Sequence, residues 1–494
     1  MQRKAASERM IIVAVMMGTI MAAVDSTIVL LALKNITNDL NTTIETSIWV
    51  ILIYLLITAV LTTQMGSVGD NFGRSRIFNI GFIIFTIASI ASGLSRPFLG
   101  LSAIQFLITM RAIQAVGAAM LQSTSSAIIS DMIPGHRRGR AFGFTAMGWN
   151  IGGTLGIVLG GIITTYLGWP FVFYINGPIG IAGYLISMVY IHDNARERKK
   201  IDYAGIITLA LSLLFLSYGA LKISTGASTN LILEYIGIGI LFGVIFVANE
   251  LKTDHPLVDF KAFKSRMLGL SLIATYFQAT GYLAVVFILI LYLQGVRNLD
   301  PLTASLYLVP GYIIASFLAP KMGAIADKIG PTILATIGIF LMMMGVMIYF
   351  TLTTSSNLLI LIAGSIVAGI GGSMFWPSNT KAVMGASNAK IYGSIGGLQR
   401  TLSNIGTLTS FVLALTIASM TVQRGLVYSI FVYGAGNELT PSNALLLMNG
   451  FRSAFIVSIT ILLIAGILSY SRGNLKHHAE GREEKYQSAP PVQK

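Results

Sequence analysis

The stretch GSVGDNFGRSR, residues Gly66–Arg76, returns in a shorter form as GAIADKIG, residues Gly323–Gly330. Both copies hold Gly, Asp and Gly in the same order and at the same spacing, and each follows an apolar run. A fainter pair consists of RAFG, residues Arg140–Gly143, and KIYG, residues Lys390–Gly393, each of which opens a long run rich in glycine. Motifs repeated in this order predict two related halves, as in membrane proteins built from internal repeats.

Long apolar runs surround these motifs along nearly the whole chain. Hydrophobic residues make up 54% of the sequence and charged residues only 11%, whereas a soluble domain carries about 25% charged residues. Because a helix needs ~20 apolar residues to cross a bilayer, we predict an all-α polytopic membrane protein with fourteen transmembrane helices. The runs are Met10–Leu33, Ile48–Met65, Ile77–Leu94, Leu101–Ile128, Ala141–Leu167, Phe171–Ile191, Tyr203–Leu221, Leu231–Asn249, Met267–Leu293, Ala304–Met322, Thr332–Leu352, Leu358–Met384, Tyr392–Met420 and Phe451–Tyr470.

The repeat divides these runs into two bundles of six with an inserted pair between them. We expect an N-terminal six-helix bundle over residues 1–195 and a C-terminal six-helix bundle over residues 267–470. The two inserted helices fall in residues 196–266, where charged loops flank them. Residues 471–494 are polar and predict a disordered cytoplasmic tail.

The formal net charge of +14 has an uneven distribution along the chain. Lys and Arg gather in the segments on the same side of the membrane as the N-terminus, for example at Arg137, Arg138 and Arg140. This asymmetry predicts a plasma-membrane protein with both termini in the cytoplasm. The excess charge then reports topology and contact with anionic membrane lipids, and no nucleic acid partner is expected.

Few residues of the chain suit enzyme or metal chemistry. Cysteine is absent, so thiolate catalysis, disulfides and cysteine metal sites are excluded. We therefore expect no enzyme activity, no metal and no cofactor, and we expect a monomer. The histidines lie in predicted loops or in the tail without metal-ligand spacing, at His136, His192, His255, His477 and His478.

Two opposite charges lie inside predicted spans of the first half. Arg111 is the only charged residue of its run, and Asp25 lies in the first run. An arginine at mid-membrane costs roughly 2.5–3.5 kcal/mol on insertion scales, so it is kept where it pairs or lines a polar cavity. If the two spans run in opposite directions, both charges lie in the same half of the bilayer. Gln114 lies one helical turn from Arg111, and we predict that these three residues serve proton coupling.

The repeated loop has an ordinary and a functional interpretation. A capped turn with positive-inside arginines is the ordinary one. The repeat favours instead a gate between the two bundles on the cytoplasmic side. Because the second copy lacks the arginines, this gate is expected to be lopsided. Its candidate residues are Gly66, Asp70, Gly73, Arg74 and Asp327.

The fifth run presents glycine at every fourth position. Gly148, Gly152, Gly156 and Gly160 form one bare helix face, against which another backbone can pack closely. Gly also weakens a helix by about 1 kcal/mol relative to Ala. We therefore predict both helix packing and a hinge at this face.

Polar and aromatic residues of the second half are candidates for a substrate cavity. Arg400 lies inside a span, and no neighbouring span of that half carries an acid. It either awaits an anionic group on the substrate or reaches back to the membrane surface. Gln278 and Asn379 are equally consistent with hydrogen bonds that join helices. The predicted cavity residues are Tyr276, Phe277, Gln278, Tyr282, Trp376, Asn379 and Arg400.

Several of these motifs together resemble the major facilitator superfamily, in particular its fourteen-span drug:proton antiporter group. GSVGDNFGRSR is similar to the loop between spans 2 and 3, and the resemblance covers nearly the whole chain. The other similar segments are VDSTIVLLAL (Val24–Leu33), RAIQAVGAA (Arg111–Ala119), GTLGIVLGG (Gly153–Gly161), PLVDFKAFKSR (Pro256–Arg266) and QGVRNLDPLTASLYLVPG (Gln294–Gly311).

The resemblance implies a proton-coupled secondary transporter that exports lipophilic or amphipathic small molecules by alternating access. Three positions depart from the family pattern. Ile157 replaces the usual proline of the span 5 motif, and Lys34 and Leu30 replace the usual proline and asparagine of the span 1 motif. Because the missing span 5 proline is linked to exchange, a symporter or uniporter that imports a small metabolite is the alternative. A membrane enzyme and a channel or passive scaffold are the other classes considered.

Overall fold

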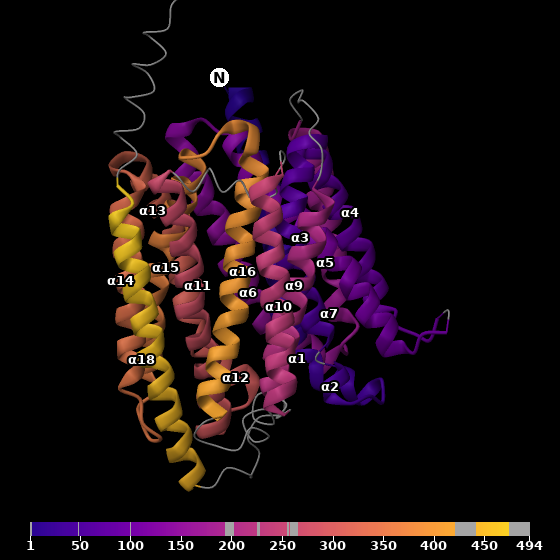
Figure 1. The fold of residues 1–494 in the computed structure, drawn as a ribbon, viewed down its shortest axis with the longest axis vertical. Helices are drawn as coiled ribbons and strands as arrows, with labels where there is room; N and C mark the ends of the chain where they lie inside the picture. Colours follow the sequence, from indigo (N-terminus) through magenta and orange to yellow (C-terminus); the bar gives the residue numbers. More distant parts are fainter. Residues whose placement is uncertain are drawn as a thin grey trace, which may run out of the picture.

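A computed structural model describes residues 2–47, 49–98, 100–192, 202–224, 228–253, 256, 265–419 and 441–473. Regular structure in this part of the chain is helical, with one isolated bridge between Phe98 and Leu101. Figure 1 shows the long helices running side by side along the longest axis. The expectation of an all-α fold is therefore confirmed.

Among its described residues, the first half contains six long helices and three short ones. The long helices are α1 (Gln2–Asp39), α3 (Trp49–Phe72), α4 (Arg74–Gly93), α5 (Ala103–Met132), α6 (Arg138–Tyr166) and α8 (Asn176–Tyr190). The short ones are α2 (Ile44–Ser47), α7 (Phe171–Tyr174) and the 3-10 turn Gly135–Arg137.

The second half repeats this pattern after two intervening helices. Those intervening helices are α9 (Tyr203–Ser224) and α10 (Thr229–Lys252). The long helices that follow are α11 (Arg266–Leu291, extended by the π-turn Tyr292–Val296), α13 (Val309–Ile329), α14 (Pro331–Phe350), α15 (Leu359–Gly385), α16 (Tyr392–Ser419) and α18 (Pro441–Ser471). The short segments are α12 (Pro301–Leu306) and the 3-10 turn Ala389–Ile391.

Glycines of the repeated motif separate consecutive helices at matching places. Gly73 lies between α3 and α4 with φ 109°, and Gly330 lies between α13 and α14 with φ 94°. A side chain with a Cβ is strained in this left-handed region, whereas glycine is not. The last glycine of each motif copy therefore lets the chain reverse direction in a single residue.

The expected number of spans is met in part. Within the described residues, twelve helices are long and apolar enough to cross a membrane. The expected runs Tyr203–Leu221 and Tyr392–Met420 are helical as α9 and α16 but are not among those twelve. In α9 the apolar helix found among described residues is the shorter Tyr203–Leu216. The fourteen-span count therefore stays a prediction.

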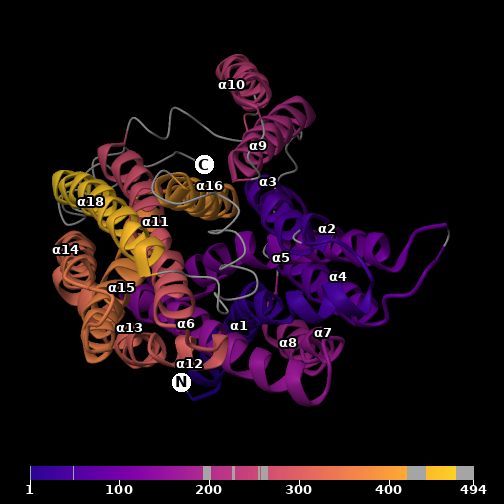
Figure 2. The ribbon, with the colours of Figure 1, turned by 90° about the horizontal axis from the view of Figure 1, so that it is seen from below.

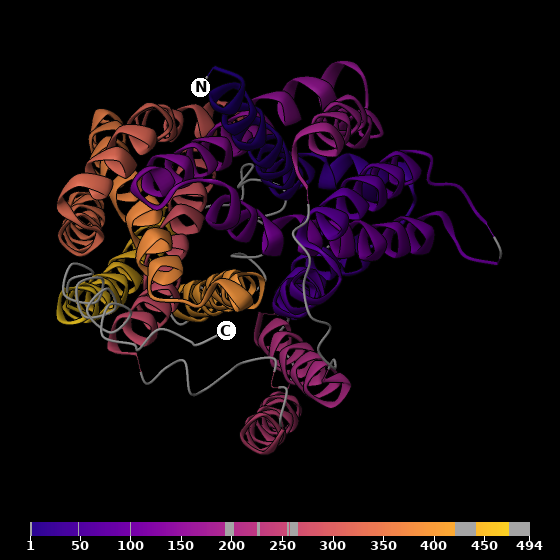
Figure 3. The same ribbon diagram turned by 90° about the horizontal axis from the view of Figure 1, so that it is seen from above.

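The helices pack mainly within their own half, and a few pairs join the halves. α6 packs on α13 and α15, and α3 and α5 pack on α16. Viewed along the helices, α9 lies against α3 and α16, while α10 lies outside α9 (Figures 2 and 3). The intervening pair thus borders the contact between the halves on one side only.

Buried apolar residues form a core in each half, and the core of the first half continues into α11, α15 and α16 of the second. Phe78, Phe82 and Phe85 are fully buried in the first half, and Tyr349 and Phe375 are nearly so in the second. The outward faces are apolar as well, and in α10 Leu241 is 57% exposed. A water-soluble monomer rarely exposes apolar patches of this extent, so these faces suit contact with lipid.

Several predictions fall on residues that are not described. The proposed tail is described only for residues 471–473, and the boundary at residue 195 lies outside the described residues. The boundary at residue 266 coincides with the first residue of α11.

Candidate functional site

Asp25 of α1 and Arg111 of α5 are in contact inside the first half. Nη1 of Arg111 donates to Oδ2 of Asp25 at 2.6 Å, and the two side chains are 1% and 0% exposed. Gln114 links both, because its Oε1 accepts from Arg111 at 2.8 Å and its Nε2 donates to Asp25 at 2.8 Å. The structure thus brings together all three residues predicted for proton coupling.

Two further residues complete this cluster and were not singled out in the sequence. Nδ2 of Asn176, on α8, donates to Oδ1 of Asp25 at 3.3 Å and to Oγ of Ser89 at 3.0 Å. The ring of Tyr54, on α3, lies 4.3 Å from Cζ of Arg111. Asn176 could have been identified in the sequence, because it is an asparagine inside the apolar run Phe171–Ile191.

Asp25 accepts hydrogen bonds from three side chains on two other helices. A carboxylate accepts at both oxygens, but a protonated carboxyl group becomes a donor at one of them. Protonation of Asp25 would remove its negative charge and turn one of its oxygens into a donor, which would weaken its contacts with these partners. The cluster thus connects a titratable side chain on α1 to side chains of α5 and α8.

A first junction between the halves consists of Asp70, Arg74, Gly393 and Ser394. The Asp70 carboxylate, at the end of α3, accepts from the backbone N–H groups of Gly393 and Ser394 at 2.9 and 2.8 Å. It thereby caps the N-terminus of α16, where the helix dipole favours a negative charge. Nη2 of Arg74 lies 2.6 Å from Oδ1 of Asp70, and Arg74 also forms an ion pair with Asp131 of α5.

A second junction consists of Asp327, Lys381, Gly139 and Arg140. The Asp327 carboxylate, at the end of α13, accepts from the backbone N–H groups of Gly139 and Arg140 at 2.9 and 3.0 Å. It thus caps the start of α6 as Asp70 caps α16. Lys381 of α15 supplies the cation, with Nζ 2.7 Å from Oδ1 of Asp327. The asymmetry expected between the two copies is therefore limited to the residue that supplies the positive charge. This residue is Arg74 in the first junction and Lys381 in the second.

Glycines allow the backbones to approach closely at both junctions. A Cβ on Gly66 would lie 2.1 Å from the carbonyl oxygen of Gly393, and one on Gly323 would lie 2.0 Å from that of Gly139. No real Cβ tolerates such a distance. Any larger residue at these positions would force the halves apart at that end of the molecule.

The glycine face of α6 packs on α1. A Cβ on Gly148 would meet Met16, one on Gly152 would lie 2.6 Å from the carbonyl oxygen of Ile20, and one on Gly156 would meet Thr27. Gly160 is also buried. The predicted packing role is therefore visible in the structure at three of these glycines.

We expect Arg74→Ala to destabilise the protein strongly. The substitution removes the guanidinium shared by Asp70 and Asp131 and leaves two carboxylates without it, and breaking a buried pair costs about 3–5 kcal/mol. Thermal unfolding of the detergent-solubilised protein measures the loss. Arg76→Ala is the matched control, because Arg76 is exposed on the same helix. Equal stability losses in the two variants would contradict the importance of the junction.

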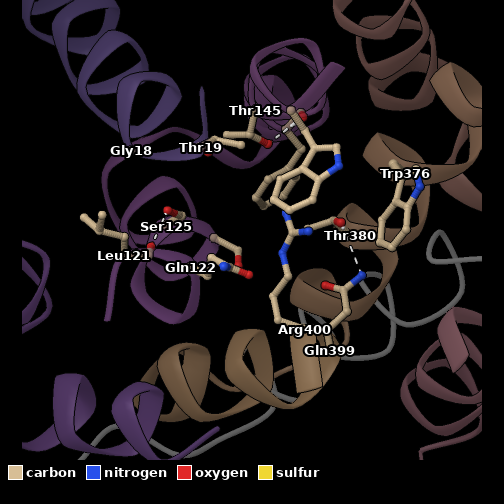
Figure 4. A pocket seen from close by; sticks show the side chains of 13 residues that line it. Gly18, Thr19, Leu121, Gln122, Ser125, Thr145, Trp376, Thr380, Gln399 and Arg400 are labelled. Atoms are coloured by element: carbon tan, nitrogen blue, oxygen red, sulfur yellow. Dashed lines mark hydrogen bonds between the residues drawn. The ribbon is translucent and has the colours of Figure 1, made fainter. Parts of the chain in front are cut away.

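A pocket lies between the two halves, and Arg400 and Trp376 are among its lining residues. Cζ of Arg400 lies 5.5 Å from the ring centre of Trp149 on α6 and 5.8 Å from that of Trp376 on α15. Figure 4 shows Arg400 in the middle of the pocket, with Gln122 on one side and Trp376 on the other. The remaining lining residues are Gly18, Thr19, Leu121, Ser125, Ser126, Phe142, Thr145, Thr380 and Gln399.

The other predicted cavity residues lie elsewhere. Tyr276, Phe277, Gln278 and Tyr282 belong to α11, where Phe277 and Tyr282 pack against the core of the second half. Gln278 is buried, and its Nε2 lies 3.3 Å from the sulfur of Met342. These four side chains do not line the pocket around Arg400.

Asn379 belongs to a separate polar cluster within the second half, which includes Arg472 just after α18. Its Nδ2 donates to Oγ1 of Thr275 at 2.8 Å, and its Oδ1 accepts from the buried Arg472. Arg472 also donates to Oγ of Ser271 at 3.0 Å and to the carbonyl oxygen of Pro331. Burial lowers the pKa of Arg472, which lies just beyond the end of α18. This cluster joins four helices of one half and has the features of a structural contact.

Comparisons with known proteins agree with this architecture. The sequence profile described as Major Facilitator Superfamily matches residues 15–411. The riboflavin transporter RibZ of Clostridioides difficile (strain 630) is 28% identical over 85% of this chain and 89% of its own length. The tetracenomycin C resistance and export protein of Streptomyces glaucescens is 27% identical over 83% of this chain and 76% of its own. The fold is similar to that of the proton:xylose symporter XylE, with a TM-score of 0.62, 14% identity and coverage of 94% and 95%.

Proposed function

The chain belongs to the major facilitator superfamily of membrane transporters, and we propose that it exports lipophilic or amphipathic small molecules in exchange for protons. Members of this family are transporters, not enzymes, and act on small molecules. The observation that carries the proposal is the buried contact between Asp25 and Arg111. A titratable pair inside a membrane span is costly to keep unless proton or substrate movement requires it.

We propose fourteen spans with both termini in the cytoplasm of a plasma-membrane protein. The clustering of arginines around the two junctions supports this orientation by the positive-inside rule. The helical character of α9 and α16 supports the count. In this scheme the bundles cover residues 1–195 and 267–470, the intervening pair covers residues 196–266, and the protein acts as a monomer.

In the proposed cycle, the two junctions close the cytoplasmic side. Their carboxylates bind helix N-termini of the opposite half, so the halves separate there only when both carboxylates release. The glycine face of α6 would serve as a hinge within the first half, because it offers no side chains that interlock with α1 and so lets α6 bend as the cytoplasmic side opens. Asp25 would exchange its proton while the other side is open.

The energy available for export fits this scheme. One proton entering the cell releases about 2.3 kcal/mol per 100 mV and about 1.36 kcal/mol per pH unit. Moving a neutral molecule against a tenfold gradient costs about 1.4 kcal/mol. One proton per molecule therefore suffices for export against gradients of about tenfold to a hundredfold.

Import of a small metabolite by a symporter or uniporter is the second candidate. Ile157 stands where the family's antiporter motif has proline, and one relative is named as a riboflavin transporter. The exchanger and the symporter predict opposite proton movements when substrate enters a vesicle, and the uniporter predicts none.

We expect substrate entry to make the interior of protein-containing liposomes more alkaline. In an exchanger each molecule that enters sends a proton out, whereas in a symporter it brings a proton in. A pH-sensitive dye inside the liposomes reports the sign, after a flux screen in liposomes has identified a transported compound. Protein-free liposomes give the background. Acidification of the interior would favour the symporter, and no pH change would favour the uniporter.

A further inference from the structure

Arg400 is a cation without a carboxylate partner among the described residues. Its guanidinium lies close to the indole rings of both Trp149 and Trp376, which come from opposite halves of the molecule. Arg400 itself belongs to α16, so the arrangement exists only while the halves are together. An arginine that reached for the membrane surface would not lie close to two rings at the interface of the halves.

The acids of the surrounding helices are already engaged by other cations. Asp25 is bound by Arg111, and Asp70 and Asp131 are bound by Arg74. Asp327, at the end of α13, is bound by Lys381 and by the start of α6. The pocket around Arg400 therefore carries an uncompensated positive charge, as judged from the described part of the chain.

Neighbouring side chains add donors and flat apolar surfaces. Gln122 of α5 lines the pocket beside Arg400 (Figure 4) and forms no hydrogen bond with the described residues. Nε2 of Gln399 donates to Oγ1 of Thr380 at 3.2 Å. The two indoles offer faces on which an aromatic ring or the guanidinium can stack.

We propose that this pocket binds an anionic group carried by a planar aromatic molecule. The guanidinium donates in a fork that matches a carboxylate, sulfonate or phosphate, and Gln122 supplies a further donor. The open space in this conformation is about 20 Å³, so the pocket would have to widen for the ring system to stack on Trp149 and Trp376. A lipophilic cation would be repelled by Arg400, and no free carboxylate lies among the lining residues to offset that repulsion. The inference names the substrate class of the proposed exporter and so rests on the proposed function.

Three naphthalene probes that differ in charge test the proposal. We would titrate 2-naphthoate, 2-naphthylmethanol and 2-naphthylmethylammonium into the purified full-length protein by calorimetry. Wild-type protein is expected to bind 2-naphthoate at least about tenfold more tightly than the ammonium probe, the difference expected for one charge-assisted hydrogen bond. Arg400→Gln is expected to abolish this preference and to leave the affinity for the alcohol nearly unchanged.

Two further variants keep the test decisive. Arg400→Lys retains the charge but not the planar fork, so an intermediate loss of naphthoate affinity is expected. Arg266→Gln removes an exposed positive charge from the start of α11 and is the control for net charge, with no change expected. If Arg400→Gln does not elute as a folded protein, Arg400→Lys and Trp376→Leu decide the matter, because each is expected to weaken naphthoate binding.

The proposal is overturned by any of three results. These are equal or tighter binding of the ammonium probe, an unchanged preference in Arg400→Gln, or no binding of 2-naphthoate to the wild type. The titrations need no proton gradient, so they are independent of coupling. An anion preference without proton-driven flux would refute the proposed function alone, and proton-driven flux without the preference would refute only this inference.

Discussion

Asp25→Asn is expected to abolish substrate transport driven by a pH gradient. Asparagine cannot take up or release a proton, so the about 1.36 kcal/mol per pH unit that the gradient supplies is lost. Exchange of substrate for substrate across the membrane needs no net proton movement and should remain measurable. The substitution would also leave Arg111 without its counter-charge, at a stability cost of about 3–5 kcal/mol.

Proteoliposomes with an imposed pH gradient provide the measurement, and substrate exchange in the same vesicles shows that the variant is folded. Asp39→Asn is the matched control on the same helix, because Asp39 is exposed and its carboxylate accepts from Nε1 of Trp169 at 3.0 Å. This control should retain gradient-driven flux. Flux equal to wild type in Asp25→Asn would remove Asp25 from the coupling mechanism.

Gly66→Ala is expected to prevent closure at the first junction. Its Cβ, fixed to the backbone of α3, would lie 2.1 Å from the backbone carbonyl oxygen of Gly393, so neither atom can turn aside. The halves would therefore separate at this end, and Asp70 would lose its contact with the start of α16. The expected result is a protein held open on the proposed cytoplasmic side, with transport reduced to near background.

The absence of cysteine makes the opening measurable with a single label. Thr380→Cys places one thiol in the pocket, and its reaction rate with a membrane-impermeant maleimide reports access. Adding Gly66→Ala is expected to raise this rate about tenfold or more from the cytoplasmic side, equivalent to a shift of about 1.4 kcal/mol in the open population. Gly135→Ala is the control, because a Cβ there meets nothing within 4 Å. An unchanged labelling rate would show that the close approach of Gly66 to Gly393 does not control opening on the cytoplasmic side.

Much of the first half's charged site was predictable from the sequence. Asp25 and Arg111 are each costly inside a span, and pairing is the simplest way to offset that cost. Gln114 was predicted to join this pair because it lies one helical turn from Arg111. The roles assigned to these residues remain predictions, because geometry does not measure proton transfer.

Other parts of the candidate site could not be predicted in this way. Lys381 lies at the end of its helix like any positive-inside lysine, and only the packing of α15 against α13 brings it to Asp327. In the sequence, Trp149 is one aromatic residue of a glycine-rich run. Only the packing of the helices places it beside Arg400 of α16. Asn379 was assigned to the cavity, whereas the structure places it in a cluster with Arg472.

The sequence by itself determined the all-α membrane fold, the duplicated halves and the positions where glycine is required. These properties depend on local composition and spacing, because hydropathy acts along one helix and a left-handed turn acts on one residue. The tertiary structure alone decided which carboxylate meets which helix end and that Arg400 lies close to two tryptophans. Such contacts join residues hundreds of positions apart, and they depend on how whole helices pack across the interface between the halves.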